Sequence, residues 1–210
     1  MDSLNRHEDY GQEALDETHL GANPIEQLKR WLLDAEAEQI YEPNAFVLGT
    51  VDQDGQPTSR TVLLKGFSDE GLFFATNYLS RKGEAVSQNP KVSAVFGWYS
   101  MYRQVLIQGV AHKVVAPESD EYFHSRPASS RIGAWASPQS AEIPNREFLE
   151  EAEKRFSADF GDQAPRPEHW GGYRLRPTEM EFWQGRPSRL HDRIHYQLDG
   201  AQWRITRLAP

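Results

Sequence analysis

The segment FWQGRPSRLHDR, from Phe182 to Arg193, concentrates positive charge near the carboxyl end of an acidic chain. Within it, Arg189, His191 and Arg193 are spaced two residues apart, so they share one face if the segment is extended. Cationic groups on one face repel one another unless an anion or an electron-rich ring lies between them. The pattern therefore predicts a site for an anionic ligand, although a basic surface turn would have the same composition.

A second candidate is the segment RTVLLK, from Arg60 to Lys65. In a regular strand these two cations point to opposite faces. The segment could be an edge strand with charged ends, or both cations could bind anionic groups. The second interpretation requires a bulge or two different ligands.

The segment TNYLSRK, from Thr76 to Lys82, joins the end of a predicted strand to a predicted helix start. Ser80 can cap the helix, which places Arg81 and Lys82 in its first turn. Cations there oppose the helix dipole unless a phosphate binds to the free N–H groups. The segment is thus either a phosphate site or an exposed basic turn.

The segment EYFHSRPASS offers a second possible phosphate site. Tyr122 and Arg126 are spaced i, i+4 and share a helix face, and Ser130 lies just past Pro127 and could turn back toward them. Two hydroxyls and a guanidinium would clamp a phosphate. His124 points elsewhere, and we expect it to be structural.

Other polar residues give weaker signals. Gln104 and the pair Gln139 and Ser140 could hydrogen-bond a heterocycle, but glutamines on strands and loops usually face water. The seven histidines contain no HExxH motif and only one short paired spacing, His191/His195, so no metal site is expected. The absence of cysteine excludes disulfides and thiolate metal sites.

Composition indicates a soluble globular protein: 210 residues, of which 38% are hydrophobic and 26% charged. No apolar run approaches the ~20 residues that a membrane span needs. The first residues, MDSLNRHEDYG, lack the basic and apolar parts of a secretory signal. We therefore expect a cytoplasmic protein.

The net charge of −8 is unevenly distributed. Residues 1–42 contain 11 acidic and 3 basic side chains, whereas residues 43–210 contain 20 of each. A neutral body with an acidic arm argues against a nucleic-acid surface, which would have a basic face.

The predicted elements indicate a mobile arm (1–22) and one domain (23–210) that is mainly β with peripheral helices. Many short antiparallel strands with few helices favour a β-barrel that carries helices over a doubly wound parallel sheet. Neither GxGxxG nor GxxxxGK[ST] follows a strand. The expected strands are 45–51, 57–65, 71–77, 91–100, 103–116, YRLRP, EMEFWQG, RIHYQL and QWRITRL; the expected helices are 24–40, 80–90, 117–127, SSRIGAWA and 145–156.

Taken together, the motifs resemble those of the pyridoxamine 5'-phosphate oxidase family. They occur in the family's order between about Pro24 and Pro210: RTVLLK, TNYLSRK, RQVLIQG, EYFHSRP with SSRIGAW, SPQS, EFWQG, RLHDR and the terminal RLAP. The resemblance implies an FMN-binding antiparallel split β-barrel (α+β) and an obligate homodimer with FMN at the subunit interface. It further implies oxidation of pyridoxamine 5'-phosphate and pyridoxine 5'-phosphate to pyridoxal 5'-phosphate, with O2 as electron acceptor and H2O2 as product.

The same resemblance implies the site residues. FMN would contact Arg60, Thr61, Val62, Leu63, Leu64, Lys65, Ala75, Thr76, Arg81, Lys82, Gln104, Gln139, Ser140, Trp183 and Arg193, with Arg81 and Lys82 at its phosphate. The substrate would contact Lys65, Tyr122, Arg126, Ser130, Arg189, Leu190, His191 and Tyr10, and the catalytic residues would be Arg189 and His191. Asp192 would be a structural partner for the cationic loop, by which we mean the part of FWQGRPSRLHDR that carries Arg186, Arg189, His191 and Arg193.

Two positions depart from the family pattern. Ala75 stands where an aromatic residue often precedes Thr76, and His7, beside Arg6, stands where the arm usually carries an arginine. Two other functions stay open: a flavin- or haem-binding split barrel without oxidase activity, and a non-catalytic carrier of pyridoxal phosphate. A split barrel without oxidase activity would generally lack the combined sets Tyr122/Arg126/Ser130 and Arg189/His191. A purified carrier of pyridoxal phosphate would be colourless, because it does not need FMN.

Overall fold

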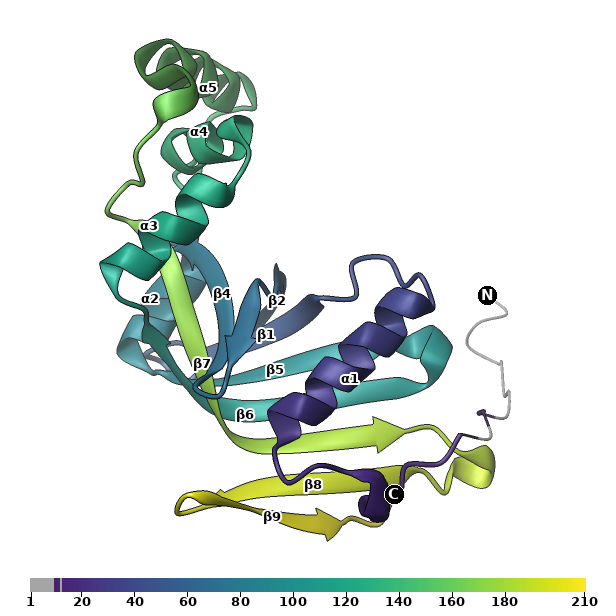
Figure 1. Ribbon diagram of the computed structural model, residues 1–210. Helices are drawn as coiled ribbons and strands as arrows, with labels where there is room; N and C mark the ends of the chain where they lie inside the picture. Colours follow the sequence, from purple (N-terminus) through teal and green to yellow (C-terminus); the bar gives the residue numbers. More distant parts are fainter. Residues whose placement is uncertain (1–9, 12) are drawn as a thin grey trace.

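The computed structural model describes residues 10–11 and 13–210, and its main element is a curled antiparallel sheet (Figure 1). Its strands are β1 (Ala45–Val51), β2 (Pro57–Leu63), β3 (Gly66–Ser68), β4 (Gly71–Asn77), β5 (Lys91–Trp98), β6 (Arg103–Lys113), β7 (Trp170–Gln184), β8 (Asp192–Asp199) and β9 (Gln202–Arg207). The strand order is β2-β1-β5-β6-β7-β4-β3, and β8 and β9 extend the sheet beside the second half of β7. The predicted fold, mainly β with peripheral helices, is confirmed.

Five α-helices surround the sheet in the described part of the chain, and α3 to α5 stack at one end of it (Figure 1). They are α1 (Pro24–Ala37), α2 (Arg81–Gln88), α3 (Ala116–Ser125), α4 (Ala128–Ala136) and α5 (Glu147–Phe160). Short 3-10 turns lie at Glu17–His19 (η2), Tyr99–Met101 (η3), Gly161–Gln163 (η4) and Pro187–Arg189 (η5).

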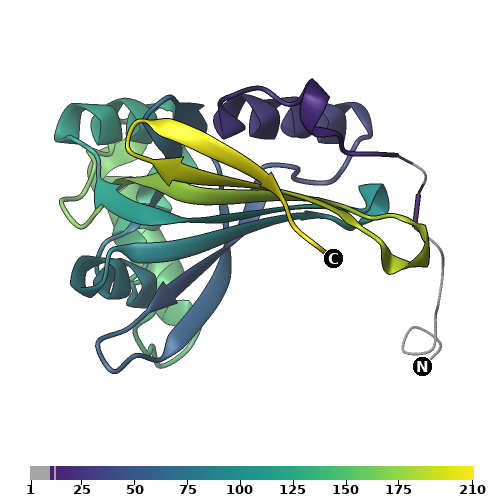
Figure 2. The same ribbon diagram turned by 90° about the horizontal axis from the view of Figure 1, so that it is seen from below.

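Helix α1 begins as the sequence predicts. The Asn23 side chain accepts a hydrogen bond from the Ile25 N–H at 2.9 Å, and Pro24 occupies the first turn. The buried residues of α1, among them Leu28 and Trp31, recur at helical spacing. Figure 2 shows α1 lying along one face of the sheet, where this apolar side joins the core.

Phe182 marks the point where α1 meets the sheet. Its side chain is fully buried, and its ring meets Trp31 of α1 at 5.3 Å and Tyr196 of β8 at 5.6 Å, both edge-on. Such aromatic pairs stabilise a core beyond the area that they bury. The contact fixes α1 against the strands that carry the cationic loop.

The opposite side of the sheet, which we call the open face, carries a continuous row of side chains. The register places Val47, Val95, Leu106, Glu181 and His195 next to one another on five neighbouring strands. Val47 is 41% exposed and Leu106 37% exposed, whereas the alternate residues of the same strands are buried in the core. The row therefore forms an apolar strip bordered by polar groups.

The structure joins two expected strands, YRLRP and EMEFWQG, into the single strand β7. Proline lacks an N–H group, which favoured an interruption at Pro177. Pro177 instead lies opposite Gly109, where the register shifts at a bulge between Gln108 and Gly109. Because the hydrogen-bond ladder between β6 and β7 is irregular at this point, it accepts a residue that has no backbone N–H to donate.

The segment before α1 packs against the body. Leu15 is 7% exposed and belongs to the main core cluster, and η2 follows it. Arg6 and His7 lie outside the described residues, and the expected boundary at residue 22 stays a prediction. No helix among residues 10–11 and 13–210 is long and apolar enough to cross a membrane.

We expect Phe182→Ala to lower the free energy of unfolding by about 3–5 kcal/mol, because it removes a buried ring and leaves a cavity. Urea denaturation followed by circular dichroism at fixed protein concentration would measure the change. Leu198→Ala, at a position that is 39% exposed, is the control and should change stability by less than about 0.5 kcal/mol. Equal effects of the two changes would contradict the assigned role of Phe182.

Candidate functional site

A cavity of about 480 Å³ lies between β2, β4, α2, α3 and α4, and we call it the cationic pocket. It brings together predicted residues from four separate segments of the chain. Its lining consists of Thr61, Val62, Leu63, Lys65, Ala75, Thr76, Asn77, Lys82, Tyr122, Arg126, Pro127, Ser130, Gln139 and Trp170. No carboxylate stands among these described lining residues, so the pocket favours an anionic ligand.

Lys82 is the centre of a hydrogen-bond network on one wall of the cationic pocket. Its Nζ donates to Thr76 Oγ1 at 3.1 Å, to Ser80 Oγ at 3.2 Å and to Gln139 Oε1 at 2.8 Å. The Ser80 hydroxyl also accepts from the Gly83 N–H at 3.3 Å, which confirms the predicted helix cap. The network joins β4, the start of α2 and the loop that follows α4.

Burial and, to a lesser extent, the neighbouring Arg60 guanidinium lower the pKa of Lys82 to about 8. The Lys82 side chain therefore lacks the solvation and the counter-charge that would hold its proton firmly. An anion bound beside it would favour the charged form. The electrostatics thus match the phosphate site predicted from TNYLSRK.

Tyr122 and Arg126 meet on the opposite wall, as their i, i+4 spacing predicts. The Arg126 guanidinium lies 4.5 Å from the ring centre of Trp170, and the Tyr122 ring stacks on the same indole at 6.1 Å and 11°. Arg126 Nη1 is buried and has no hydrogen-bond partner among the described residues. An unsatisfied buried donor is costly, so this group is prepared for an acceptor from a ligand.

Trp170 is a site residue that the sequence reasoning missed. It holds both Tyr122 and Arg126, and Arg166 in turn donates to the Trp170 carbonyl at 2.7 Å. Burial lowers the pKa of Arg126 and raises that of the Tyr122 phenol, which therefore keeps its proton as a donor. No spacing rule connects Trp170 to α3; only its place opposite Asn77 in the sheet does so.

A second group of predicted residues lies at the far end of the sheet, and we call it the sheet-end patch. The register places Gln104, Trp183 and Arg193 side by side on β6, β7 and β8. His191 packs on Trp183 at 4.5 Å, and Tyr10 meets His191 edge-on at 5.0 Å. The patch is thus an aromatic and cationic surface that includes a residue of the N-terminal segment.

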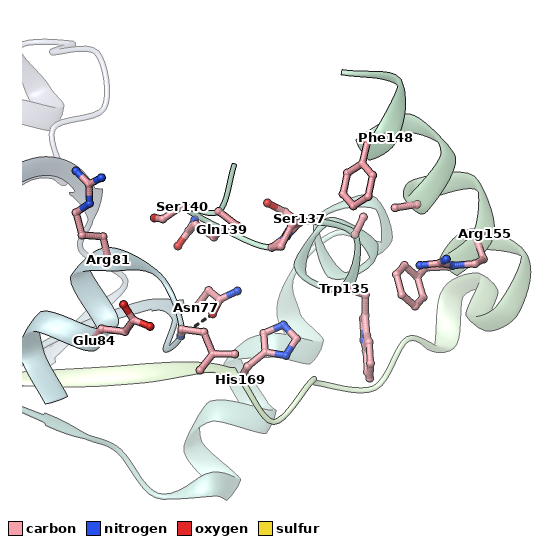
Figure 3. A pocket seen from close by; sticks show the side chains of 16 residues that line it. Asn77, Arg81, Glu84, Trp135, Ser137, Gln139, Ser140, Phe148, Arg155 and His169 are labelled. Atoms are coloured by element: carbon pink, nitrogen blue, oxygen red, sulfur yellow. Dashed lines mark hydrogen bonds between the residues drawn. The ribbon is translucent and has the colours of Figure 1, made fainter. Parts of the chain in front are cut away.

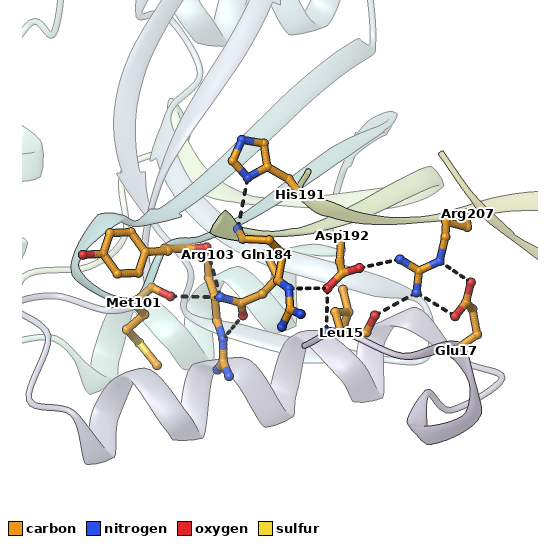
Figure 4. A network of polar contacts seen from close by, with 10 residues as sticks. Leu15, Glu17, Met101, Arg103, Gln184, His191, Asp192 and Arg207 are labelled. Atoms are coloured by element: carbon orange, nitrogen blue, oxygen red, sulfur yellow. Dashed lines mark hydrogen bonds and ion pairs between the residues drawn. The ribbon is translucent and has the colours of Figure 1, made fainter. Parts of the chain in front are cut away.

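His191 has a defined tautomer in this patch. The Arg186 backbone N–H donates to His191 Nδ1 at 3.1 Å, which leaves the proton of the neutral ring on Nε2 (Figure 4). Burial, together with the nearby Arg189 charge, lowers the pKa of His191, so the ring is neutral at pH 7. It can therefore present an Nε2–H donor to a ligand.

The remaining residues of the cationic loop are arranged differently from the expected extended line. Arg189 lies in η5 with φ of 60°, so it leaves the face that a strand would share with His191 and Arg193. Arg193 forms a two-point ion pair with Glu181 at 2.7 and 2.9 Å, and this partner raises the pKa of Arg193. Leu190 is 70% exposed.

The cationic pocket and the sheet-end patch are separate within one chain. Trp170 and Trp183 stand near opposite ends of β7, and a strand rises about 3.3 Å per residue, so tens of ångströms divide them (Figure 1). None of the sheet-end residues lines the cationic pocket.

Other predicted residues lie outside both groups. Arg60 donates to Leu48 O and Thr50 Oγ1 within its own hairpin, and Leu64 is buried in the core. Arg81 and Ser140 line a neighbouring cavity of about 670 Å³ between α2, α4 and α5 (Figure 3). That cavity shares Asn77 and Gln139 with the cationic pocket, so the two spaces are adjacent.

Comparison with known proteins agrees with this geometry. A family model described as "Pyridoxamine 5'-phosphate oxidase" matches residues 32–158, and one described as "Pyridoxine 5'-phosphate oxidase C-terminal dimerisation region" matches residues 170–210. Curated proteins called pyridoxine/pyridoxamine 5'-phosphate oxidase are similar to the chain. The protein from Polynucleobacter asymbioticus is 58% identical over 100% of both chains, and that from Bordetella avium is 55% identical over 96% of both.

Solved structures show the same fold. PhzG from Burkholderia lata 383, in complex with tetrahydrophenazine-1-carboxylic acid, is 34% identical with a TM-score of 0.90 and covers 94% of this chain and 98% of its own. A pyridoxamine 5'-phosphate oxidase-related FMN binding protein from Nostoc punctiforme has a TM-score of 0.73 at 18% identity, over 91% of this chain and 100% of its own. These likenesses confirm the predicted split barrel.

Proposed function

The chain belongs to the pyridoxamine 5'-phosphate oxidase family, and from this membership we propose that it is an FMN-dependent oxidase of pyridoxamine 5'-phosphate and pyridoxine 5'-phosphate. The product would be pyridoxal 5'-phosphate, with O2 as electron acceptor and H2O2 released, as in vitamin B6 biosynthesis and salvage. The observation that carries the proposal is Arg126 Nη1, a buried donor with no hydrogen-bond partner among the described residues, which Trp170 holds in a pocket whose described lining contains no carboxylate. We place the reaction in the cytoplasm.

The residues of the cationic pocket fit FMN. Lys82, Thr76 and Gln139 form a polar wall whose cation lacks a counter-charge, which suits a phosphate and a hydrogen-bonding ring. Arg81 and Ser140, in the adjacent cavity, lie close enough along the chain to complete that site. When bound, FMN would supply the redox chemistry, taking up two electrons from the 4'-carbon of the substrate and passing them to oxygen.

The opposite wall suits the phosphate of the substrate. Lys65, Tyr122, Arg126 and Ser130 line it, and together they offer two cations and two hydroxyl donors. Trp170 packs on both Tyr122 and Arg126, so it restricts the conformations that these two side chains can adopt. This wall favours a phosphorylated substrate over an unphosphorylated aromatic acid.

The sheet-end patch would reach this pocket from a second copy of the chain. The match to a dimerisation region covers β7 to β9, which carry Trp183, Arg189, His191 and Arg193. The apolar strip of the open face, with Val47 and Leu106, is the surface that a partner can cover. We therefore propose a homodimer in which each active site uses the cationic pocket of one copy and the sheet-end patch of the other.

In this arrangement Arg189 would lie against the pyridine ring, orient it and stabilise developing negative charge. His191, neutral and with its proton on Nε2, would donate a hydrogen bond to the substrate or move a proton. Tyr10 would cover the ring from the N-terminal segment, since it already packs on His191 and Trp183. Holding the substrate in register with the flavin and excluding water is the main contribution of the protein.

The direct test is an aerobic assay of the FMN-loaded protein with each of the two phosphorylated substrates. We expect aldehyde and peroxide to form in equal amounts, because one turnover yields one of each. A yellow protein that forms neither would favour a flavin-binding split barrel without oxidase activity. A colourless protein that binds pyridoxal phosphate would favour a carrier.

We expect FMN affinity to fall above pH 8. The Lys82 pKa of about 8 lies below that of a free lysine, so the amine binds phosphate as a cation below pH 8 and loses its charge above it. Between pH 7 and 9 the FMN dissociation constant should rise roughly 5- to 10-fold. Quenching of flavin fluorescence by the apoprotein would measure it.

Two variants control this titration. Lys82→Met should weaken FMN binding and flatten its pH dependence. Lys91→Met changes an exposed lysine outside the pocket and should leave both the FMN affinity and its pH dependence unchanged. A slope that persists in Lys82→Met would assign the titration to another group.

The shared site predicts complementation between inactive variants. Arg126→Met damages the cationic pocket and Arg189→Met damages the sheet-end patch, so each homodimer should be nearly inactive. A purified heterodimer of the two would contain one doubly damaged site and one intact site, and should have about half of the wild-type activity. Co-expression with two different tags would isolate it. If the cationic pocket and the sheet-end patch of one chain formed a site together, the heterodimer would be as inactive as the two homodimeric variants.

A further inference from the structure

The segment from Glu13 to Glu17 is attached to the sheet at every second residue. Glu13 pairs with Arg103 at 2.9 Å, the Leu15 side chain enters the core, and Glu17 pairs with Arg207 at 2.7 Å. In an extended segment alternate residues lie on one side, so the side chains of Glu13, Leu15 and Glu17 form the side that faces the body. The N-terminal segment is thus fixed by charge as well as by burial.

Arg207, on the last strand, uses its whole guanidinium in this attachment (Figure 4). Nε and Nη2 donate to the two oxygens of Glu17 at 2.7 and 2.8 Å, and Nη2 also donates to the Leu15 carbonyl at 2.9 Å. Nη1 donates to Asp192 Oδ1 at 2.5 Å. Planar two-point pairing of this kind gives directional control that a single charge contact lacks.

Asp192 completes the connection. Its Oδ2 accepts the Leu15 N–H at 3.1 Å and lies 3.5 Å from Arg186 Nε, and its side chain is only 17% exposed. We call Arg207, Asp192 and Glu17 the clasp. It joins three parts of the chain that are far apart in sequence: the N-terminal segment, the cationic loop and the last strand.

The clasp lies directly behind the sheet-end patch. Asp192 follows His191 in the chain, and Arg186, which approaches Asp192, donates its N–H to the His191 ring. The Tyr10 ring meets that ring edge-on at 5.0 Å, and its centre is 5.2 Å from that of Tyr102. The clasp therefore secures the chain at Leu15 and Glu17, a few residues after Tyr10, which packs on His191.

An ordinary surface ion pair would not have this arrangement. Arg204 stands on the same strand as Arg207, and its guanidinium donates to the Gln197 side chain of the adjacent strand. Arg207, in contrast, connects two carboxylates and a backbone carbonyl from other parts of the chain. Networks that span distant segments contribute more than isolated exposed pairs.

We propose that Arg207 is a positioning residue: through Asp192 and Glu17 it holds the N-terminal segment so that Tyr10 covers the His191 side of the active site. The proposal rests on the proposed function for its effect on the substrate. The attachment of the segment itself is independent of that function and can be measured without FMN or substrate.

The first experiment is limited proteolysis of the full chain with a glutamate-specific protease, followed by mass spectrometry. Arg207→Gln removes the charge and keeps the size, and we expect cleavage after Glu13 and Glu17 to become roughly 10-fold faster, because the segment opens more often. Arg204→Gln is the matched control and should be cleaved at the wild-type rate. A wild-type rate in Arg207→Gln would overturn the proposal.

The second experiment separates positioning from general damage through steady-state kinetics. Arg207→Gln should raise KM for pyridoxine 5'-phosphate about 5- to 20-fold and change kcat by less than about 3-fold. The reason is that the clasp positions Tyr10 over the bound substrate and does not touch the reacting groups. In a Tyr10→Ala background the same change should add no further increase in KM. Independent, multiplying effects of the two changes would overturn the proposal.

Glu17→Gln is the second variant if Arg207→Gln fails to fold. It keeps the Arg207–Asp192 pair, leaves the Glu13 cleavage site and should show the same direction in both experiments. If the wild-type protein forms no aldehyde, the proposed function fails, yet the proteolysis rates still decide whether the clasp holds the segment.

Discussion

Half-buried cations that have no acidic partner within the described part of the chain set the main constraint on this structure. Lys82 loses solvation in the cationic pocket, and Arg126 holds a buried N–H that has no acceptor among the described residues. Burying charge in this way is unfavourable unless something compensates for it. The neutral hydroxyls and amide around Lys82, and the Trp170 ring beneath Arg126, keep both groups in place without neutralising them. The compensation is left to an anionic ligand.

At the other end of the sheet, in contrast, the arginines have acidic partners. Arg103, Arg193 and Arg207 each pair with at least one carboxylate, so their charges are balanced within the chain. Two of these carboxylates, Glu13 and Glu17, belong to the acidic first part of the sequence. The uneven charge of the chain therefore has a structural use. Acidic residues near the N-terminus pair with arginines of the sheet, while the cationic pocket keeps its positive charge for binding.

Local interactions made part of this arrangement predictable. The caps at Asn23 and Ser80 depend on neighbouring residues alone, and the structure has both helix starts as expected. Trp170 was missed because its contacts with α3 arise only when β7 pairs with β4. The sequence predicts two strands around Pro177 because the register shift that accommodates the proline arises only when β7 pairs with β6. The shared face of Arg189, His191 and Arg193 depends on an extended segment, and a 3-10 turn with positive φ at a non-glycine residue has no clear sequence signal.

Strand β7 carries both groups of residues that we propose to form one site, and it keeps them apart within one chain. Trp170, at its start, supports the cationic pocket, and Trp183, near its end, supports the sheet-end patch. A two-fold axis pairs a surface with itself, and an axis perpendicular to β7 would turn the start of the strand in one copy toward its end in the other. A single self-complementary contact would then complete two identical sites, and it would place the unpaired cations of one copy opposite the neutral His191 and the aromatic rings of the other.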